Sequence, residues 1–178
     1  SKKFRFLEND IQDTDLDKIL DIGDIVIHLA AITDAASSFK KADLVEKNNF
    51  GITERIVNSC VRKKSKLIFI SSTSVYGTQK DMVFEDCDLS DLKPQSPYAE
   101  TKLKEEDLIT KSIEQSGLEA TIYRFGTIYG VSPGMRFQTA VNKFCWQAVM
   151  SQPLTIWSTA YEQKRPYLYL TDAIRAID

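Results

Sequence analysis

The feature that most constrains the fold is a set of three short apolar runs that do not alternate with polar residues. They occupy residues 24–29 (Asp-Ile-Val-Ile-His-Leu), 66–70 (Lys-Leu-Ile-Phe-Ile) and 120–125 (Ala-Thr-Ile-Tyr-Arg-Phe). Continuous apolarity of this kind is typical of strands that are covered on both faces, as in a parallel sheet. Parallel strands need crossover connections, which helices usually supply. The runs therefore predict an α/β chain.

Helical patterns lie between these runs. Residues 45–61 place Ile52, Ile56, Val57 and Cys60 at helical spacing. A second helix is predicted to begin at Ser96-Pro97 and to end at Ser116-Gly117, because serine is a good N-cap, proline suits the first helical position and glycine suits the C-terminus. Strands alternating with helices predict a three-layer fold with helices on both faces of a parallel sheet.

A glycine-rich turn is absent from the chain. A complete Rossmann-type domain opens with a strand, a G-x-G-x-x-G-type turn and a helix, whereas the seven glycines here form no cluster. Residues 3–11 are interpreted instead as a later strand and its following loop. We therefore expect residues 1–178 to form a single partial Rossmann-like domain, incomplete at the N-terminus. The less regular segment 131–164 is expected to lie over one edge of the active-site cleft.

Composition excludes several classes of function. A formal charge of −2 gives no general attraction to nucleic acid or to an anionic membrane, and no apolar run is long enough to cross a bilayer. Three scattered cysteines and a single histidine, His28, lack metal-ligand spacing, so no metal site is expected. Reduced thiols, together with a start too short and too charged for a signal peptide, favour a cytoplasmic protein.

The motif that carries chemistry is Tyr98-Ala-Glu-Thr-Lys102, which places a phenol and an ammonium on one helix face, one turn apart. An ordinary tyrosine has a pKa of about 10. A neighbouring cation and the positive end of the helix both favour the phenolate, so Tyr98 is a candidate acid/base group. A second pair at this spacing, Tyr76 and Lys80, is interrupted by glycine and polar residues, which makes a shared helix face there improbable.

A loop rich in hydroxyl groups, Ser71-Ser-Thr-Ser-Val-Tyr-Gly77, follows the apolar run 66–70 directly. Ligands of α/β proteins bind at the carboxyl ends of parallel strands. Taken alone, the loop fits equally well a turn whose hydroxyls bond their own backbone. Beside Tyr98, it predicts part of an active site. His28 is interpreted as a packed histidine at a strand end and is left out of the site.

Several further segments share their order and spacing with one family. They are Asp10-Ile11, residues 28–31 (His-Leu-Ala-Ala), Asn48 with Gly51, residues 71–77, Tyr98 with Lys102, residues 124–130 and residues 165–173. In these segments together the chain resembles the extended short-chain dehydrogenase/reductases, which include the NAD-dependent nucleotide-sugar epimerases and dehydratases. Each segment is degenerate alone, and the specificity comes from their order.

The resemblance implies a cofactor, a substrate and roles for individual residues. The cofactor would be NAD, with NADP not excluded because the strand that precedes its selecting residue is absent. The catalytic residues would be Ser72, Tyr98 and Lys102. The cofactor contacts would come from Asp10, Ile11, Leu29, Ala30, Ala31, Asn48 and Lys102. The nucleotide-sugar contacts would come from Ser72, Thr73, Thr127 and Arg165.

The implied reaction is epimerisation of a nucleotide sugar, as in a UDP-glucose 4-epimerase. Tyr98 would remove a hydroxyl proton, hydride would move to NAD, and the keto-sugar would receive hydride on its other face. Dehydratases of the family carry an acidic pair where this chain has Thr73 and Ser74, so dehydration is disfavoured. A related NAD(P)-dependent reductase, decarboxylase or dehydratase remains an alternative.

A non-catalytic cofactor-binding or interaction fragment is a second alternative, since the glycine-rich unit and the C-terminal substrate-binding part of the family are both missing. The resemblance also suggests a homodimer through helices at 45–63 and 96–116, although their apolar stripes serve equally well as ordinary core.

Overall fold

The computed structural model describes residues 4–33, 38–78, 82–156, 158–161 and 163–178. The chain divides into two compact units. The first comprises residues 1–70 and 96–122, and the second comprises residues 71–95 and 123–178. Two strands, β2 (Lys66–Ser72) and β3 (Ala120–Phe125), run from the first unit into the second.

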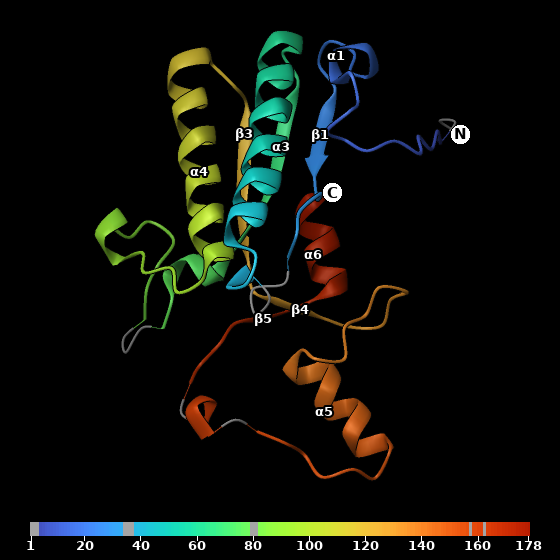
Figure 1. Ribbon diagram of the computed structural model, residues 1–178, viewed down its shortest axis with the longest axis vertical. Helices are drawn as coiled ribbons and strands as arrows, with labels where there is room; N and C mark the ends of the chain where they lie inside the picture. The colour runs from blue at the N-terminus through green and yellow to red at the C-terminus, as the bar shows by residue number, and fades with distance from the viewer. Residues whose placement is uncertain (1–3, 34–37, 79–81, 157, 162) are drawn as a thin grey trace. The chain divides into compact units, whose positions relative to one another are not determined.

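A three-stranded sheet forms the framework of the first unit (Figure 1). Its strand order is β1-β2-β3, and β1 (Ile25–His28) pairs with β2 in parallel, with Ile25 opposite Lys66 and His28 opposite Phe69. The helix α3 (Ala42–Lys63) connects β1 to β2, and α4 (Pro97–Ser116) lies between β2 and β3 in the chain. The α/β class with parallel strands, expected from the apolar runs, is confirmed.

The helices α3 and α4 run side by side and cover one face of this sheet (Figure 1). Alternate residues of β2 point toward the helices, so Leu67 and Phe69 are fully buried while their neighbours are less so. The core cluster consists of Ile52, Ile56, Val57, Cys60, Leu67, Phe69, Ile109 and Leu118. This packing fixes which side of α4 faces the interior.

The ends of α4 follow from the residues that flank it. The Ser96 hydroxyl accepts a hydrogen bond from the Ala99 amide at 3.2 Å, and Pro97 is the first helical residue. Gly117 ends the helix with a left-handed φ of 66°, and its amide donates to the Ile113 carbonyl. The predicted bounds of this helix are confirmed.

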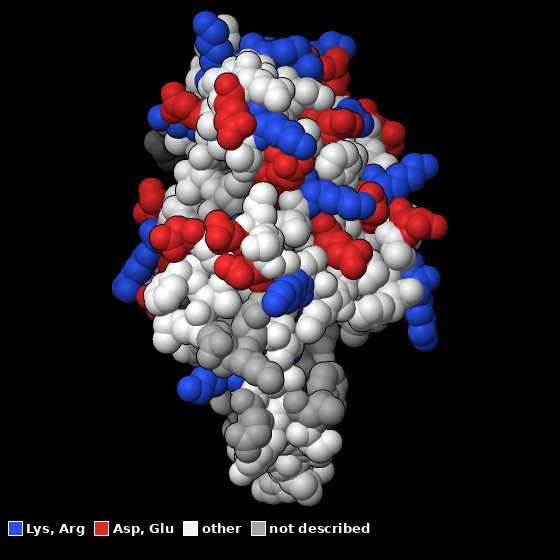
Figure 2. Space-filling view, turned by 90° about the vertical axis from the view of Figure 1, so that its left-hand side faces the viewer, with Lys and Arg blue, Asp and Glu red and all other residues white. Residues whose placement is uncertain are grey.

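The solvent-facing side of α4 carries both signs of charge. Figure 2 shows acidic and basic side chains interspersed over this part of the molecule. Two ion pairs account for part of the mixture: Lys111 Nζ lies 2.6 Å from Asp107, and Lys104 Nζ lies 2.7 Å from Glu46 of α3. No helix in the described part of the chain combines the length and apolarity that crossing a bilayer requires.

The opposite face of β1 is open to solvent within this unit. Ile25 is 63% exposed and Ile27 is 47% exposed, because they alternate with Val26 and His28, which point toward the helices. A strand predicted within residues 3–11 is not formed: residues 4–8 belong to no sheet, and Lys3 lies outside the described residues. A strand needs a partner for its backbone groups, and residues 4–8 have none in the sheets described.

The second unit begins with two short 3-10 turns, η1 (Thr73–Tyr76) and η2 (Leu89–Asp91). Its two-stranded sheet pairs β4 (Thr127–Tyr129) in parallel with β5 (Tyr167–Tyr169). Between these strands, the segment 131–164 contains the ten-residue helix α5 (Ala140–Val149) and the turn η3 (Ser158–Ala160).

The last helix, α6 (Leu170–Ile177), follows β5 without an intervening loop. Asp172 lies in its first turn, and the Asp172 carboxylate accepts a hydrogen bond from Arg175 at 3.4 Å. Tyr169 occupies the capping position and makes no side-chain cap bond. The strand β5 runs directly into this helix, so the change of backbone conformation comes at residue 170.

We predict opposite effects for alanine at two glycines. Gly77 has a φ of 66°, and a Cβ built there would lie 2.0 Å from the Lys93 carbonyl oxygen. Gly77→Ala should therefore destabilise the chain by about 3 kcal/mol through strain and overlap. Gly51, inside α3, has open space around its Cβ position, so Gly51→Ala should stabilise by about 0.5–1 kcal/mol.

Urea unfolding of both variants and of the parent chain measures these changes as shifts of the midpoint. Equal midpoints for the two variants would contradict the assignment of Gly77 as a position that only glycine can occupy.

Candidate active site

The proposed acid/base pair lies on α4. Tyr98 is in the first turn of the helix and Lys102 is one turn later, with the lysine Nζ 6.0 Å from the centroid of the tyrosine ring. The same Nζ lies 4.4 Å from the centroid of the Phe69 ring. Lys102 is only 3% exposed, whereas Tyr98 is half-buried. The ammonium is therefore held inside the unit beside two aromatic rings. The faces of these rings attract a cation, so this position stabilises the charged form of Lys102.

An acidic residue that sequence reasoning missed completes the surroundings of Lys102. The Glu105 carboxylate lies 3.1 Å from the lysine Nζ, and both side chains are almost fully buried. Positions 98, 102 and 105 follow helical spacing, so an acid three residues after the lysine was a signal available in the sequence. The pairing compensates a charge whose burial would otherwise be costly.

His28 is the last residue of β1 and is buried, as predicted for a packed strand-end histidine. Its ring lies 5.6 Å from that of Phe69, and its Nε2 lies 2.9 Å from the Thr53 hydroxyl. Burial, with a smaller contribution from the Lys102 charge, lowers the pKa of His28 to about 4. The ring is therefore neutral at physiological pH.

This shift predicts a pH dependence of stability. Because the folded pKa is depressed below its ordinary value of 6.5, the unfolded state takes up the proton first as pH falls. The folded chain should lose about 3 kcal/mol between pH 6.5 and 4 from this group, and nothing from it above pH 6.5. His28→Gln keeps a donor for Thr53 and should remove this component of the pH dependence, as measured by denaturant unfolding at several pH values.

Because the chain has a single histidine, its NMR signal can be followed without assignment. Titration of that ring with a midpoint near 6.5 in the folded chain would contradict the buried neutral state.

Three of the residues expected to line the cofactor, at positions 29–31, come directly after β1. Leu29 is 65% exposed, Ala30 is exposed and Ala31 is half-buried. The Asn49 side chain accepts from the Ile32 amide at 2.8 Å and donates to the Ile32 carbonyl at 3.0 Å, which fixes the segment after the strand. Small side chains on a fixed, exposed backbone leave room for a ligand to approach.

Asn48 and the loop at residues 10–12 lie side by side. The Gln12 amide group donates to the Asn48 side-chain oxygen at 2.5 Å, and the Gln12 backbone donates to the Asp10 carboxylate at 2.8 Å. Asp10 is exposed, whereas Ile11 is half-buried and packs against the apolar core. The structure thus brings Asp10 of the loop and Asn48 of α3, 38 positions apart in the chain, into one polar cluster joined by Gln12.

The remaining predicted residues belong to the second unit. Ser72 ends β2, and its hydroxyl accepts a hydrogen bond from the Ser74 amide at 3.2 Å, which starts η1 at Thr73. The Thr127 amide donates to the Pro166 carbonyl at 3.1 Å, so Thr127 lies beside the residue that follows Arg165. The Arg165 guanidinium is exposed and donates twice to the Gln163 side-chain oxygen, at 3.1 and 2.7 Å.

Of the second Tyr–Lys pair, the structure describes the tyrosine. Tyr76 ends η1, and its hydroxyl accepts a hydrogen bond from Arg124 at 3.0 Å, with the guanidinium 5.0 Å from the ring centroid. Lys80 lies outside the described residues. The described residues contain no group of three or more side chains placed to hold a metal ion.

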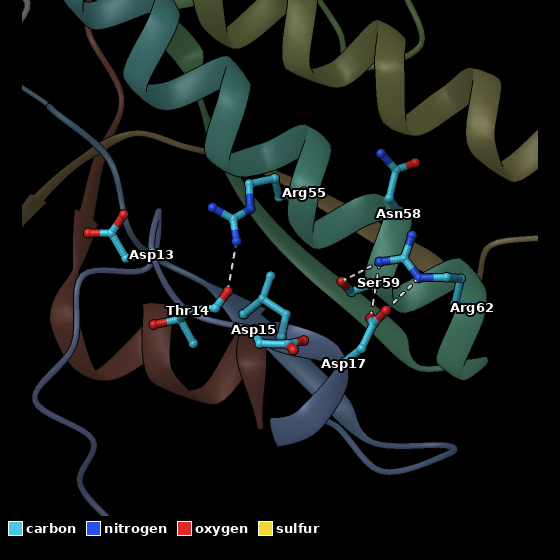
Figure 3. Close-up of a pocket in the computed structure, with 9 residues that line it drawn as sticks. Asp13, Thr14, Asp15, Asp17, Arg55, Asn58, Ser59 and Arg62 are labelled. Carbon is cyan, nitrogen blue, oxygen red and sulfur yellow. Dashed lines mark hydrogen bonds and ion pairs between the residues drawn. The ribbon is translucent and has the colours of Figure 1, made fainter.

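A polar cavity of about 350 Å³ lies elsewhere in the first unit, between α1 (Leu16–Ile19) and α3 (Figure 3). It is lined by Asp13, Thr14, Asp15, Leu16, Asp17, Arg55, Asn58, Ser59 and Arg62. Arg62 donates to both oxygens of Asp17, which lowers the pKa of that carboxyl, and Arg55 donates to the Thr14 carbonyl at 2.7 Å. The Asp17 bonds tie α1 to α3, and the Thr14 bond ties the residues before α1 to the same helix. None of the predicted site residues lines the cavity.

A model of the NAD dependent epimerase/dehydratase family matches residues 1–178. The chain belongs to this family. It is 32% identical, over 178 residues, to an uncharacterized UDP-glucose epimerase of Bacillus subtilis, a match that covers 99% of this chain and 54% of that protein. It is 31% identical to a dTDP-D-glucose 4,6-dehydratase of Dictyostelium discoideum, covering 98% of this chain and 43% of that protein.

Among solved structures, the UDP-glucuronic acid 4-epimerase of Bacillus cereus, in complex with UDP-glucuronic acid and NAD, superposes with a TM-score of 0.85. The identity is 35%, over 99% of this chain and 55% of that one. The chain thus spans about half the length of the relatives it matches.

Proposed function

We propose that the protein containing this chain catalyses NAD-dependent epimerisation of a nucleotide sugar, with UDP-hexoses epimerised at carbon 4 as the first candidates. The observation that carries the proposal is the pair on α4, in which the Lys102 ammonium is buried one turn from the half-buried Tyr98. The 35% identity to a UDP-glucuronic acid 4-epimerase supports the choice of reaction and of substrate class.

The residues present fit NAD as the cofactor. Leu29 and Ala30 are exposed, and Ala31 follows them. The two alanines have small side chains, so a cofactor could approach the backbone there. Asp10 and Asn48 belong to one polar cluster that could bond a nucleoside, and Ile11 packs against the apolar core beside it. The Lys102 ammonium has donors for ribose hydroxyls. When bound, NAD would supply the acceptor and donor of hydride.

Tyr98 would move the proton in this reaction. Its phenolate would remove the proton of a sugar hydroxyl, and its phenol would return a proton when the carbonyl is reduced. The Lys102 cation stabilises the anionic form through its charge. The Ser72 hydroxyl accepts from Ser74 and keeps its own proton, which it could donate to the oxygen of the sugar.

Substrate contacts would come from the second unit. Arg165 is exposed, and its planar fork, which here donates to Gln163, would suit a diphosphate. Thr127 donates to the carbonyl of Pro166, the next residue in the chain. Thr73 adds a hydroxyl directly after Ser72. We propose that segment 131–164, which includes α5, contributes to one edge of the substrate cleft.

The absence of an acid at two positions favours epimerisation over dehydration. Thr73 and Ser74 stand where dehydratases of this family carry two carboxylic acids, and a hydroxyl is not a general acid at neutral pH. A decarboxylase or reductase that uses the same tyrosine would be separated by its products. Free cysteines fit a cytoplasmic location, and α3 with α4 is a candidate dimer interface.

The test compares Tyr98→Phe with Tyr123→Phe in the product of the complete gene. Removing the proton carrier should lower kcat for UDP-sugar epimerisation by about 10²- to 10⁴-fold, while calorimetric NAD binding stays within a few-fold. The Tyr123 hydroxyl donates to the Ala176 carbonyl and is not among the proposed site residues, so this variant should keep the parent kcat.

Binding of NAD and UDP-glucose or UDP-glucuronic acid, followed by chromatography of the product sugars, distinguishes the outcomes. Epimer formation lost only in Tyr98→Phe establishes the proposal. Carbon dioxide or a deoxy-keto sugar as product would replace it with decarboxylation or dehydration, and failure to bind either ligand would leave an interaction module.

A further inference from the structure

A series of buried polar side chains links β1, α3 and α4 in the first unit. His28 Nε2 lies 2.9 Å from Thr53 Oγ1, Thr53 Oγ1 donates to Glu105 Oε1 at 2.5 Å, and Glu105 Oε2 lies 3.1 Å from Lys102 Nζ. His28 is 4% exposed and Lys102 is 3% exposed, while Thr53 and Glu105 are fully buried. The proposed catalytic lysine is therefore connected to three residues that stand outside the predicted site: Glu105, Thr53 and His28.

The directions of these hydrogen bonds follow from the number of protons available. The Thr53 hydroxyl has one proton, which it donates to Glu105, so its oxygen accepts the bond from His28. The imidazole must then carry its proton on Nε2. Its Nδ1 has no hydrogen-bond partner among the described residues, so the neutral ring acts as a fixed donor.

The two carboxylate oxygens of Glu105 have different partners. Its Oε1 is anchored by Thr53, whereas its Oε2 has the Lys102 charge nearby but no aligned hydrogen bond. The ammonium is thus compensated electrostatically while its N–H groups stay able to donate to another acceptor. The charge that Tyr98 faces is that of an ion pair, smaller in effect than that of an isolated cation.

We propose that Glu105 is a positioning residue of the reaction: it fixes the Lys102 ammonium beside Tyr98, and by compensating that charge it sets the pH at which Tyr98 becomes a competent base. Thr53 and His28 orient the carboxylate. The inference rests on the proposed function, because it assigns Tyr98 the role of proton carrier.

Other titratable groups near the network stay the same in the variants compared. Those buried in the described part of the first unit are His28 on β1, Cys60 on α3, and Lys102, Glu105 and Glu106 on α4. Burial raises the pKa of the Cys60 thiol to about 11, so it remains uncharged. The pair Lys104–Glu46 joins the exposed sides of α4 and α3.

The first test replaces the charge and keeps the shape. In Glu105→Gln, the Lys102 cation loses its counter-charge, so the phenolate of Tyr98 gains stabilisation. The acidic limb of the kcat–pH profile should move to lower pH by about one unit. Asp107→Asn removes a carboxylate from the exposed face of the same helix, where it pairs with Lys111, and should leave the limb unchanged. No shift, or a shift to higher pH, overturns the proposal.

A second readout does not require turnover. Tyrosine labelled with ¹³C at Cζ reports its own titration by NMR, and Tyr98→Phe identifies the signal. In the absence of substrate, this titration should move to lower pH in Glu105→Gln and stay in place in Asp107→Asn. If the protein shows no epimerase activity but the Tyr98 titration moves, the proposed function fails and the positioning role stands. If turnover is normal and neither readout moves, the positioning role fails alone.

A variant at Thr53 covers the case in which Glu105→Gln does not fold. Thr53→Val removes the hydroxyl that anchors Oε1, and Thr53→Ser keeps it. Loss of the anchor should lower kcat about tenfold through misplacement of the lysine, with KM changed less, and serine should restore it. Equal kcat values for the valine and serine variants would overturn the role of the network.

Discussion

A lysine ammonium that is removed from water must be compensated, and in this chain Lys102 is compensated by the Glu105 carboxylate and the face of Phe69. Phe69 belongs to β2 and both charged residues belong to α4, so the contact of the ammonium with the Phe69 ring exists only when helix and strand are correctly packed. The same seating buries Leu67 and Ile109. Hydrophobic packing and placement of the charged group therefore require one and the same arrangement.

Much of the first unit could be predicted because its signals are local. Ser96, Pro97 and Gly117 act within one turn of the helix ends, so α4 was located to the residue. The strand predicted near the N-terminus failed for the opposite reason. Strand formation there depends on a partner that no local pattern of Phe4 and Phe6 can specify, and both rings are largely exposed.

The candidate site divides along the same line. Tyr98 and Lys102 were proposed from their spacing, because a helix fixes the relation between positions four apart. The bond between Thr53 and Glu105 joins residues 52 positions apart on different helices. The sequence contains Glu105 on the correct helical stripe, but only the packing of α3 against α4 reveals that its Oε1 accepts from Thr53.

The buried histidine has a consequence for the charge of the whole molecule. His28 is the single histidine of the chain, and its ring stays neutral down to about pH 4. Folding therefore suppresses the one titration that would ordinarily add a positive charge near pH 6.5. Between about pH 5 and 6, the net charge of the native chain is roughly one unit more negative than that of its unfolded form. Its isoelectric point consequently lies below the value that composition alone would give, and native and unfolded chains should separate by electrophoretic mobility as well as by size.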